Sequence, residues 1–170
     1  SLKAKLCVRG KNLLYEYCEK FNISHSNTKK MIVSTTNEES QILLKLRDKA
    51  AKNGVQLDLI NGHDAVEREP NLFAVSALVS PTTGIVDAAG LAASFQHQAE
   101  LNGASLALET KITKITQNSK ILVSGTSGGE EFEAEFDFLI NAAGHGAHKL
   151  TQSYWPDAPP LPKNFAKGNY

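Results

Sequence analysis

The segment Phe138-Leu139-Ile140-Asn141-Ala142-Ala143-Gly144-His145-Gly146 carries the most informative local pattern of the chain. Its apolar run predicts a strand over 136–141, and the small residues that follow predict a tight turn into a short helix. Backbone can approach a ligand closely where no bulky side chain intervenes, and the amides of a helix N-terminus favour phosphate. The pattern therefore fits either a dinucleotide or flavin contact or a plain packed turn. The sequence contains no GxGxxG fingerprint that would decide between them.

Short β segments precede this stretch. Alternating and β-branched residues predict strands over 105–109, 110–116, 120–125 and 131–135. Asn118-Ser119 and Gly128-Gly129 separate the last three of them, which predicts antiparallel hairpins.

The first hundred residues mix helices and strands. Apolar stripes predict helices over 1–21 and 38–52 and after Asp87, with Ser1 and Asp87 as N-caps, and a short polar helix over 63–69. Strands are predicted over 29–36, 55–60 and 73–79, and again over 165–170. The order predicts an α+β fold with a mixed or antiparallel sheet and one βαβ-like passage over 73–108.

Composition bounds the class of protein. The 170 residues include 18 basic and 18 acidic side chains, so the formal net charge is zero, and 41% are hydrophobic. These values predict a globular chain and argue against binding to nucleic acid or to an anionic membrane through a large basic surface. No apolar run approaches the roughly 20 residues that span a bilayer.

The two cysteines are predicted to be free thiols. Cys7 and Cys18 fall on one predicted helix, where their Cα atoms would be about 16 Å apart. A disulfide requires a separation below about 7 Å. Unpaired thiols fit a reducing compartment.

Three further groups have a functional and a structural interpretation. The segment Ser80–Asp87 is either a substrate-facing loop or an ordinary turn before a capped helix. Asp64, Glu67 and Glu69 suit acid–base chemistry, but a solvated short helix explains them as well. His145 and His148 share the i, i+3 spacing of a helical face, yet lack further nameable ligands, so no metal site is predicted.

Seven blocks in register resemble the L-2-hydroxyglutarate dehydrogenase/oxidase family of FAD-dependent, D-amino-acid-oxidase-like flavoproteins. These blocks are Ser1–Cys7, Leu14–Cys18, Lys30–Val33, Glu69-Pro70, Pro81–Asp87, Asn141–Gly144 and Lys167–Tyr170. The chain departs from the family at Lys29, where glycine is usual, and at His145, where an apolar residue is usual. The wider group includes glycerol-3-phosphate dehydrogenases and glycine and sarcosine oxidases, so a sibling substrate stays open.

The resemblance implies an internal fragment of a longer enzyme. Residues 1–104 would belong to the substrate domain, and residues 105–150 to part of a Rossmann-like FAD-binding domain. Residues 151–170 would form a proline-rich linker and the start of a further substrate-domain strand. The family's glycine-rich FAD loop lies upstream of the position that matches Ser1, so the fragment is expected to be inactive alone.

The resemblance also implies site residues and a reaction. Cofactor contacts would come from Lys111, Ile112, Ala142, Ala143, Gly144 and Gly146, and substrate contacts from Lys5 and Tyr170; no catalytic residue can be named. The full-length enzyme would oxidise L-2-hydroxyglutarate to 2-oxoglutarate by hydride transfer to FAD. The alternatives are a related flavoprotein acting on glycerol 3-phosphate, an amine or an amino acid, and a non-catalytic ligand-binding module.

The expected partner is a small-molecule substrate, with no nucleic acid and no membrane span. Strand edges left unpaired by the fragment's limits predict a homo-oligomer or an exposed apolar face. The expected location is cytoplasmic, or peripheral to a membrane for the full-length enzyme.

Overall fold

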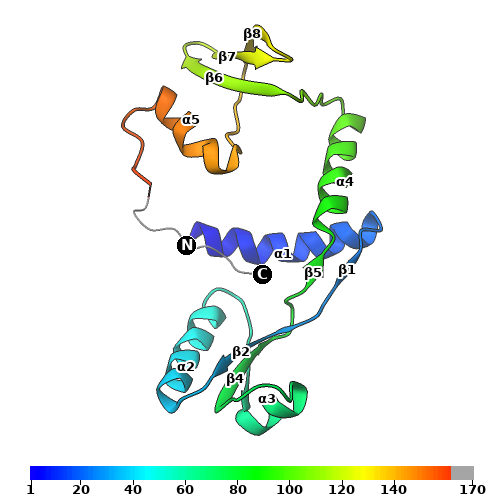
Figure 1. Ribbon diagram of the computed structural model, residues 1–170, viewed down its shortest axis with the longest axis vertical. Coiled ribbons are helices and arrows are strands. Elements are labelled where there is room, and N and C mark those ends of the chain that lie inside the picture. Colours follow the sequence, from blue (N-terminus) through cyan, green and yellow to red (C-terminus); the bar gives the residue numbers. More distant parts are fainter. Residues whose placement is uncertain (162–170) are drawn as a thin grey trace. The chain divides into compact units, whose positions relative to one another are not determined.

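The computed structural model describes residues 1–161, and the chain divides into two compact units, Ser1–Ala104 and Ser105–Tyr170 (Figure 1). The strand expected over 165–170 and the candidate residue Tyr170 lie outside the described residues. The assignment of the two units to a substrate domain and an FAD-binding domain stays a prediction.

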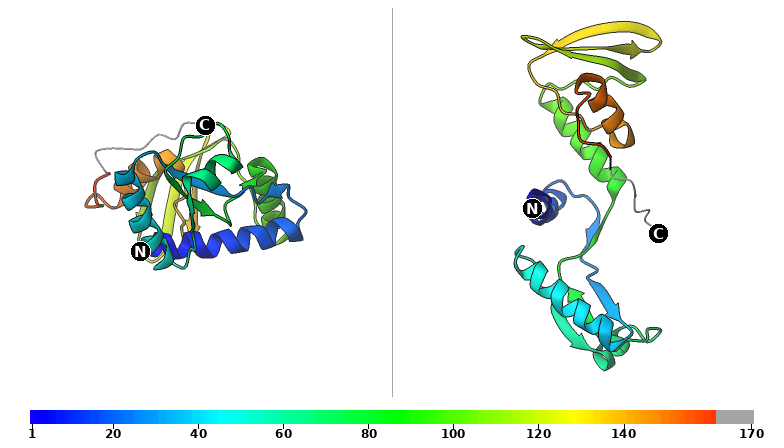
Figure 2. Two further views of the ribbon diagram at one scale, coloured as in Figure 1. Left: turned by 90° about the horizontal axis from the view of Figure 1, so that it is seen from below. Right: turned by 90° about the vertical axis from the view of Figure 1, so that its left-hand side faces the viewer.

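A three-stranded antiparallel sheet forms the core of the first unit. Its order is β2 (Lys30–Ser34), β4 (Ser76–Ser80), β3 (Asp58–Asn61). The helices α2 (Asn37–Ala51) and α3 (Gly62–Arg68) pack against it (Figure 2). The central strand supplies the most buried side chains, because β4 has a neighbour on both edges and helices packed against it: Ala77 and Leu78 are both fully buried.

Hydroxyl groups fix the start of α2 to this sheet. The fully buried Ser34 places its Oγ 2.9 Å from Ser40 Oγ and 2.8 Å from Ser76 Oγ, so three hydroxyls satisfy one another. Nearby, the exposed Glu39 carboxylate accepts hydrogen bonds from the backbone amide and hydroxyl of Thr35. These bonds favour the ionised form and hold the pKa of Glu39 below its usual value.

The long helix α1 (Leu2–Lys20) and the helix α4 (Ala88–Leu101) complete the first unit, with the two-stranded ribbon of β1 (His25–Ser26) and β5 (Ile85–Val86). The Tyr17 ring lies 4.6 Å from that of Phe95, and the Tyr17 hydroxyl lies 3.0 Å from Ser94 Oγ, so α1 contacts α4. Both predicted N-caps are confirmed, since Ser1 and Asp87 accept backbone N–H groups of the helices that follow them.

The second unit is an antiparallel meander of β6 (Thr110–Gln117), β7 (Ile121–Ser127) and β8 (Glu130–Phe136). The predicted hairpins are confirmed, and Gly128 (φ +58°) and Gly129 (φ +89°) make the second turn, where a side chain would be strained. The helix α5 (Ala147–Tyr154), which follows the 3-10 turn η1 (Gly144–Gly146), packs against β6.

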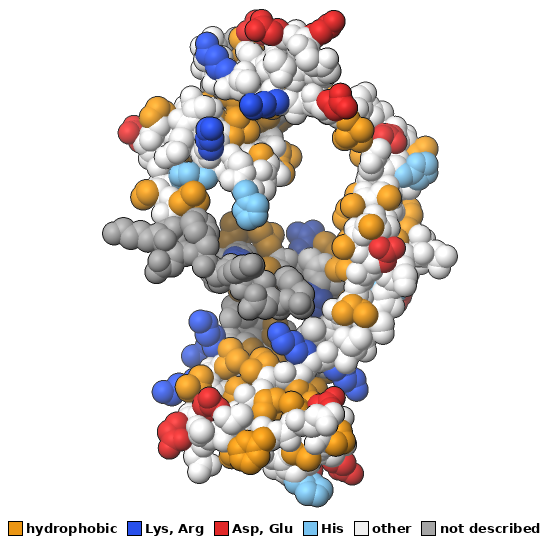
Figure 3. Space-filling model, viewed as in Figure 1, with side chains coloured by type: hydrophobic (Ala, Val, Ile, Leu, Met, Phe, Trp, Pro, Cys, Tyr) orange, Lys and Arg blue, Asp and Glu red, His pale blue; other side chains and the backbone are white. Residues whose placement is uncertain are grey.

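Among the described residues, β8 pairs with β7 alone and forms one edge of this meander. It carries exposed acidic side chains, which Figure 3 shows in red where Figure 1 places β7 and β8. They are Glu130, Glu131, Glu133 and Glu135.

Several sequence-based expectations are wrong. The segments 105–109 and 137–141 form no strand, and Phe138 and Ile140 are each 89% exposed. An apolar run becomes a strand only when a neighbour satisfies its backbone groups, and no described strand pairs with either segment.

The βαβ-like passage is also absent, because β4 pairs antiparallel with β2 and β3 whereas β6 belongs to another sheet. The strands β3 and β4 each begin three residues later than the expected starts at 55 and 73.

None of the helices in the described part of the chain is both long and apolar enough to cross a membrane.

Candidate functional site

The side chain of Asn141 organises the loop that leads into α5. Its Nδ2 donates to the Ala147 carbonyl at 2.8 Å and to Thr151 Oγ1 at 3.0 Å. Its Oδ1 accepts the Ala143 backbone N–H at 3.3 Å. The Asn141 side chain therefore connects the loop at Ala143 with the first two turns of α5. Asn141 was not predicted as a functional residue from the sequence.

The loop presents bare backbone on its outer surface. The predicted cofactor contacts Ala142, Ala143, Gly144 and Gly146 are all exposed. A Cβ added at Gly144 or Gly146 would meet no atom within 4 Å, and no side chain caps η1 or α5. The Ala143 and Gly146 amides bond within the loop, but small side chains on an unobstructed surface at a helix start still suit an anionic group such as a phosphate, so the residues present fit the predicted FAD contact.

The other predicted contacts lie on different elements. Lys111 is exposed and Ile112 half-buried on β6, the strand against which α5 packs, so both belong to the same unit as the loop. Lys5 is an exposed residue of α1 in the first unit.

The first unit contains a cavity of about 370 Å³ between α1 and the segment that runs from β4 into β5. Lys11 and Tyr15, one turn apart on α1, both reach Thr82. Lys11 Nζ donates to the Thr82 hydroxyl at 2.9 Å, and the Tyr15 hydroxyl donates to the Thr82 carbonyl at 3.3 Å. The His25 ring stands edge-on to Tyr15, with centroids 5.6 Å apart.

The segment Ser80–Asp87 was interpreted either as a substrate-facing loop or as an ordinary turn before a capped helix, and the structure shows features of both. Asp87 does cap α4, but Thr82, Thr83 and Gly84 also line the cavity. Lys11 and Tyr15 were not predicted as site residues. Their i, i+4 spacing on an amphipathic helix was the available signal, and it is common on helices without a site.

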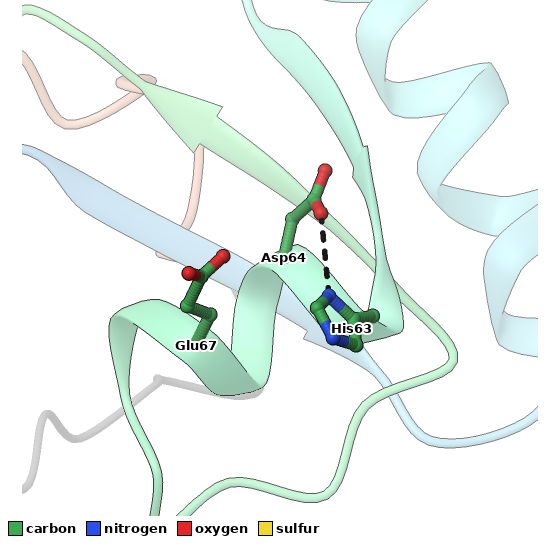
Figure 4. A group of neighbouring side chains, drawn as sticks. All are labelled: His63, Asp64 and Glu67. Carbon is green, nitrogen blue, oxygen red and sulfur yellow. Dashed lines mark ion pairs between the residues drawn. The ribbon is translucent and has the colours of Figure 1, made fainter.

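The start of α3 brings together His63, Asp64 and Glu67, whose side-chain ligand atoms lie within 4.8 Å of one another (Figure 4). His63 Nδ1 lies 3.7 Å from Asp64 Oδ1, and the His63 side chain is 87% exposed. Asn61 caps the helix by accepting the Asp64 N–H and donates its own amide to the Asp64 carboxylate. Helix capping thus accounts for the position of Asp64, in agreement with a solvated helix start.

Comparison with known proteins places the chain in a family. The profile of the DAO family, described as FAD dependent oxidoreductase, matches residues 1–169, and the chain belongs to this family.

The similar curated proteins share a name. The chain is 34% identical over 164 residues to the human protein named "L-2-hydroxyglutarate dehydrogenase, mitochondrial", covering 89% of this chain and 35% of that one. It is 27% identical over 152 residues to the L-2-hydroxyglutarate dehydrogenase of Escherichia coli K12, covering 89% and 36%. The chain thus spans little more than a third of the length of these relatives.

Solved structures share the fold. L-proline dehydrogenase from P. horikoshii superposes with a TM-score of 0.79 at 22% identity, covering 93% of this chain and 42% of that one. Glycine oxidase from Geobacillus kaustophilus gives a TM-score of 0.73 at 24% identity, covering 87% and 41%. These structures support the α+β fold.

Proposed function

We propose that the chain is part of an FAD-dependent oxidoreductase that oxidises a 2-hydroxy acid, with L-2-hydroxyglutarate as the substrate. The observation that carries this proposal is the similarity, across 89% of the chain, to human and bacterial proteins named L-2-hydroxyglutarate dehydrogenase. A bound FAD would supply the hydride acceptor for the substrate α-carbon. The substrate hydroxyl would release its proton to solvent, so the product would be 2-oxoglutarate.

In this proposal the second unit belongs to the FAD-binding domain and the first to the substrate domain. The small residues Ala142, Ala143, Gly144 and Gly146 would let the cofactor pyrophosphate approach the backbone closely, and loop amides other than those of Ala143 and Gly146, which bond within the loop, would donate to its oxygens. Asn141 positions the loop through its bonds to Ala143, Ala147 and Thr151.

Four further residues complete the proposed site. The β6 backbone at Lys111 and Ile112 meets the adenine, and Lys5 and Tyr170 face the substrate. The exposure of Lys111 and Lys5 is compatible with these roles. Tyr170 rests on the sequence resemblance alone.

The substrate is tested by flavin reduction. We expect the full-length protein, purified with its flavin, to lose the absorbance of the oxidised cofactor on anaerobic mixing with L-2-hydroxyglutarate. The D-enantiomer is the matched control, since it differs only in the configuration at the α-carbon that carries the transferred hydrogen. It should reduce the flavin far less. Bleaching by glycerol 3-phosphate, proline or glycine, without bleaching by L-2-hydroxyglutarate, would assign the protein to a sibling activity.

The cofactor contact is tested by Gly146→Val in the same protein. Gly146 has a helical backbone (φ −81°) and open space beside it, so valine should leave the thermal unfolding midpoint nearly unchanged. A side chain here would keep the loop amides away from the phosphate. A hydrogen bond to a charged group contributes about 1.5–3 kcal/mol, so we expect FAD affinity to fall about tenfold or more.

The control for this variant is Gly10→Val on α1, where an added Cβ also meets no atom within 4 Å. Titration of the apoprotein with FAD, followed by flavin fluorescence, measures both. Equal FAD affinity in Gly146→Val and the unsubstituted protein would show that the loop does not contact the cofactor.

A further inference from the structure

We propose that the cavity between α1 and the segment 80–86 binds a small carboxylate with an apolar body. The cavity belongs entirely to the first unit, and the proposal does not rest on the oxidoreductase activity proposed above.

The cavity wall carries positive charge without a carboxylate to match it. Its lining includes the Lys11 ammonium but no Asp or Glu. Within residues 1–161, no carboxylate oxygen lies within 4.0 Å of the Lys11 ammonium, whose hydrogen bond is to the neutral Thr82 hydroxyl. An ammonium has three N–H donors, so two remain for a ligand. Lys11 is half-buried, and a charge-assisted hydrogen bond from its ammonium to a carboxylate is stronger than a bond between neutral groups.

The rest of the wall is largely apolar. Half-buried side chains of Val8, Leu14, Val55 and Val86 line it together with the more exposed Ile85. A volume of about 370 Å³ is near the lower end of the roughly 300–1,000 Å³ of ligand pockets. The cavity is therefore suited to a compact aliphatic or aromatic acid. A dicarboxylate would bring a second charge into a largely apolar wall whose lining has a single ammonium, which is costly.

The polar end of the cavity is already formed without a ligand. Lys11 and Tyr15 both bond to Thr82, and His25 Nδ1 lies 2.8 Å from the Ile23 carbonyl, to which it donates. These bonds restrict the side chains that a carboxylate would meet. A ligand then needs to order few groups on binding, which favours affinity.

The chain contains its own reporter of occupancy. Cys7 is exposed and lines the cavity, whereas Cys18, which also lines it, is only 1% exposed. Alkylation by iodoacetamide, quantified on each cysteine peptide by mass spectrometry, therefore measures access to the cavity at Cys7. Cys18 is expected to react only when the unit unfolds, and so reports loss of structure.

The experiment uses hexanoate as the probe, with the 170-residue chain. We expect hexanoate to slow Cys7 alkylation in a saturable manner, whereas hexanol and glutarate protect far less at equal concentration. Lys11→Met keeps an unbranched side chain without the ammonium, and should raise the half-saturating hexanoate concentration about tenfold. Lys3→Met, at an exposed α1 position outside the cavity lining, is the matched control and should bind as the unsubstituted chain does.

Four outcomes would overturn the proposal. They are the absence of saturable protection by hexanoate, equal protection by hexanol, stronger protection by glutarate, and unchanged hexanoate binding in Lys11→Met. A rise in Cys18 alkylation in any variant identifies unfolding. In that case Lys11→Gln, which retains a neutral hydrogen-bond donor, replaces Lys11→Met and is expected to weaken hexanoate binding in the same direction.

Discussion

Replacing Leu78 with alanine is expected to lower the free energy of unfolding of the Ser1–Ala104 unit by about 2–5 kcal/mol. Leu78 is fully buried at the middle of the central strand β4, opposite Ile32 on one neighbour and Leu59 on the other. Truncation removes apolar burial and leaves a cavity that the paired strands cannot close. Because whole domains are stable by only about 5–15 kcal/mol, the loss is a large part of the total. Urea unfolding followed by far-UV circular dichroism measures it.

Leu59→Ala is the matched control for this change. Leu59 is opposite Leu78 in the β3–β4 register but is 43% exposed, so the same truncation removes much less burial. We expect less than half of the Leu78→Ala effect. Equal losses for the two variants would show that the core is not centred on β4.

Gly84→Ala is expected to destabilise the same unit by about 1–3 kcal/mol, the usual cost of overpacking. A Cβ at Gly84 would collide with the Ser26 carbonyl and with the Tyr15 hydroxyl. The carbonyl belongs to the backbone of β1, which pairs with β5, so the clash cannot be relieved by a side-chain rotation alone. The thermal unfolding midpoint should therefore fall.

Gly10→Ala should change the same midpoint in the opposite direction. Gly10 lies inside α1, and an added Cβ meets no atom within 4 Å. Alanine in place of glycine in a helix interior gains about 0.5–1 kcal/mol. If both alanine variants raise the midpoint, the close approach of Gly84 to β1 and α1 is not present in solution.

Local signals in the sequence predicted the elements that depend on few neighbours. Asp87 caps α4 as expected, and Gly128-Gly129 makes the hairpin turn, because both features are set within four residues of chain. The strand predicted over residues 137–141 does not form, because its formation depends on distant neighbours. Its apolar pattern reports burial or pairing, but whether a partner strand is present is not encoded in the segment itself.

The same distinction separates the two candidate sites. Ala142, Ala143, Gly144 and Gly146 lie within five positions of one another, so their shared small size was visible in the sequence. The cavity wall instead joins Lys11 to Thr82, which are 71 positions apart. Only the folding of α1 beside the β4–β5 segment brings these residues together, and no spacing rule connects them.

The glutamate-rich strand β8 has a consequence for self-association. An open strand edge invites the edge of another sheet, and such extension is a common route to aggregates. If a second copy added its own β8 antiparallel to this one, two rows of glutamate side chains would face each other across the new ladder, and like charges directly opposite destabilise strand pairing. The negative charge on β8 thus opposes the pairing of this strand with the β8 strand of a second copy. Its protection would weaken as acid neutralises the carboxylates or as salt screens them.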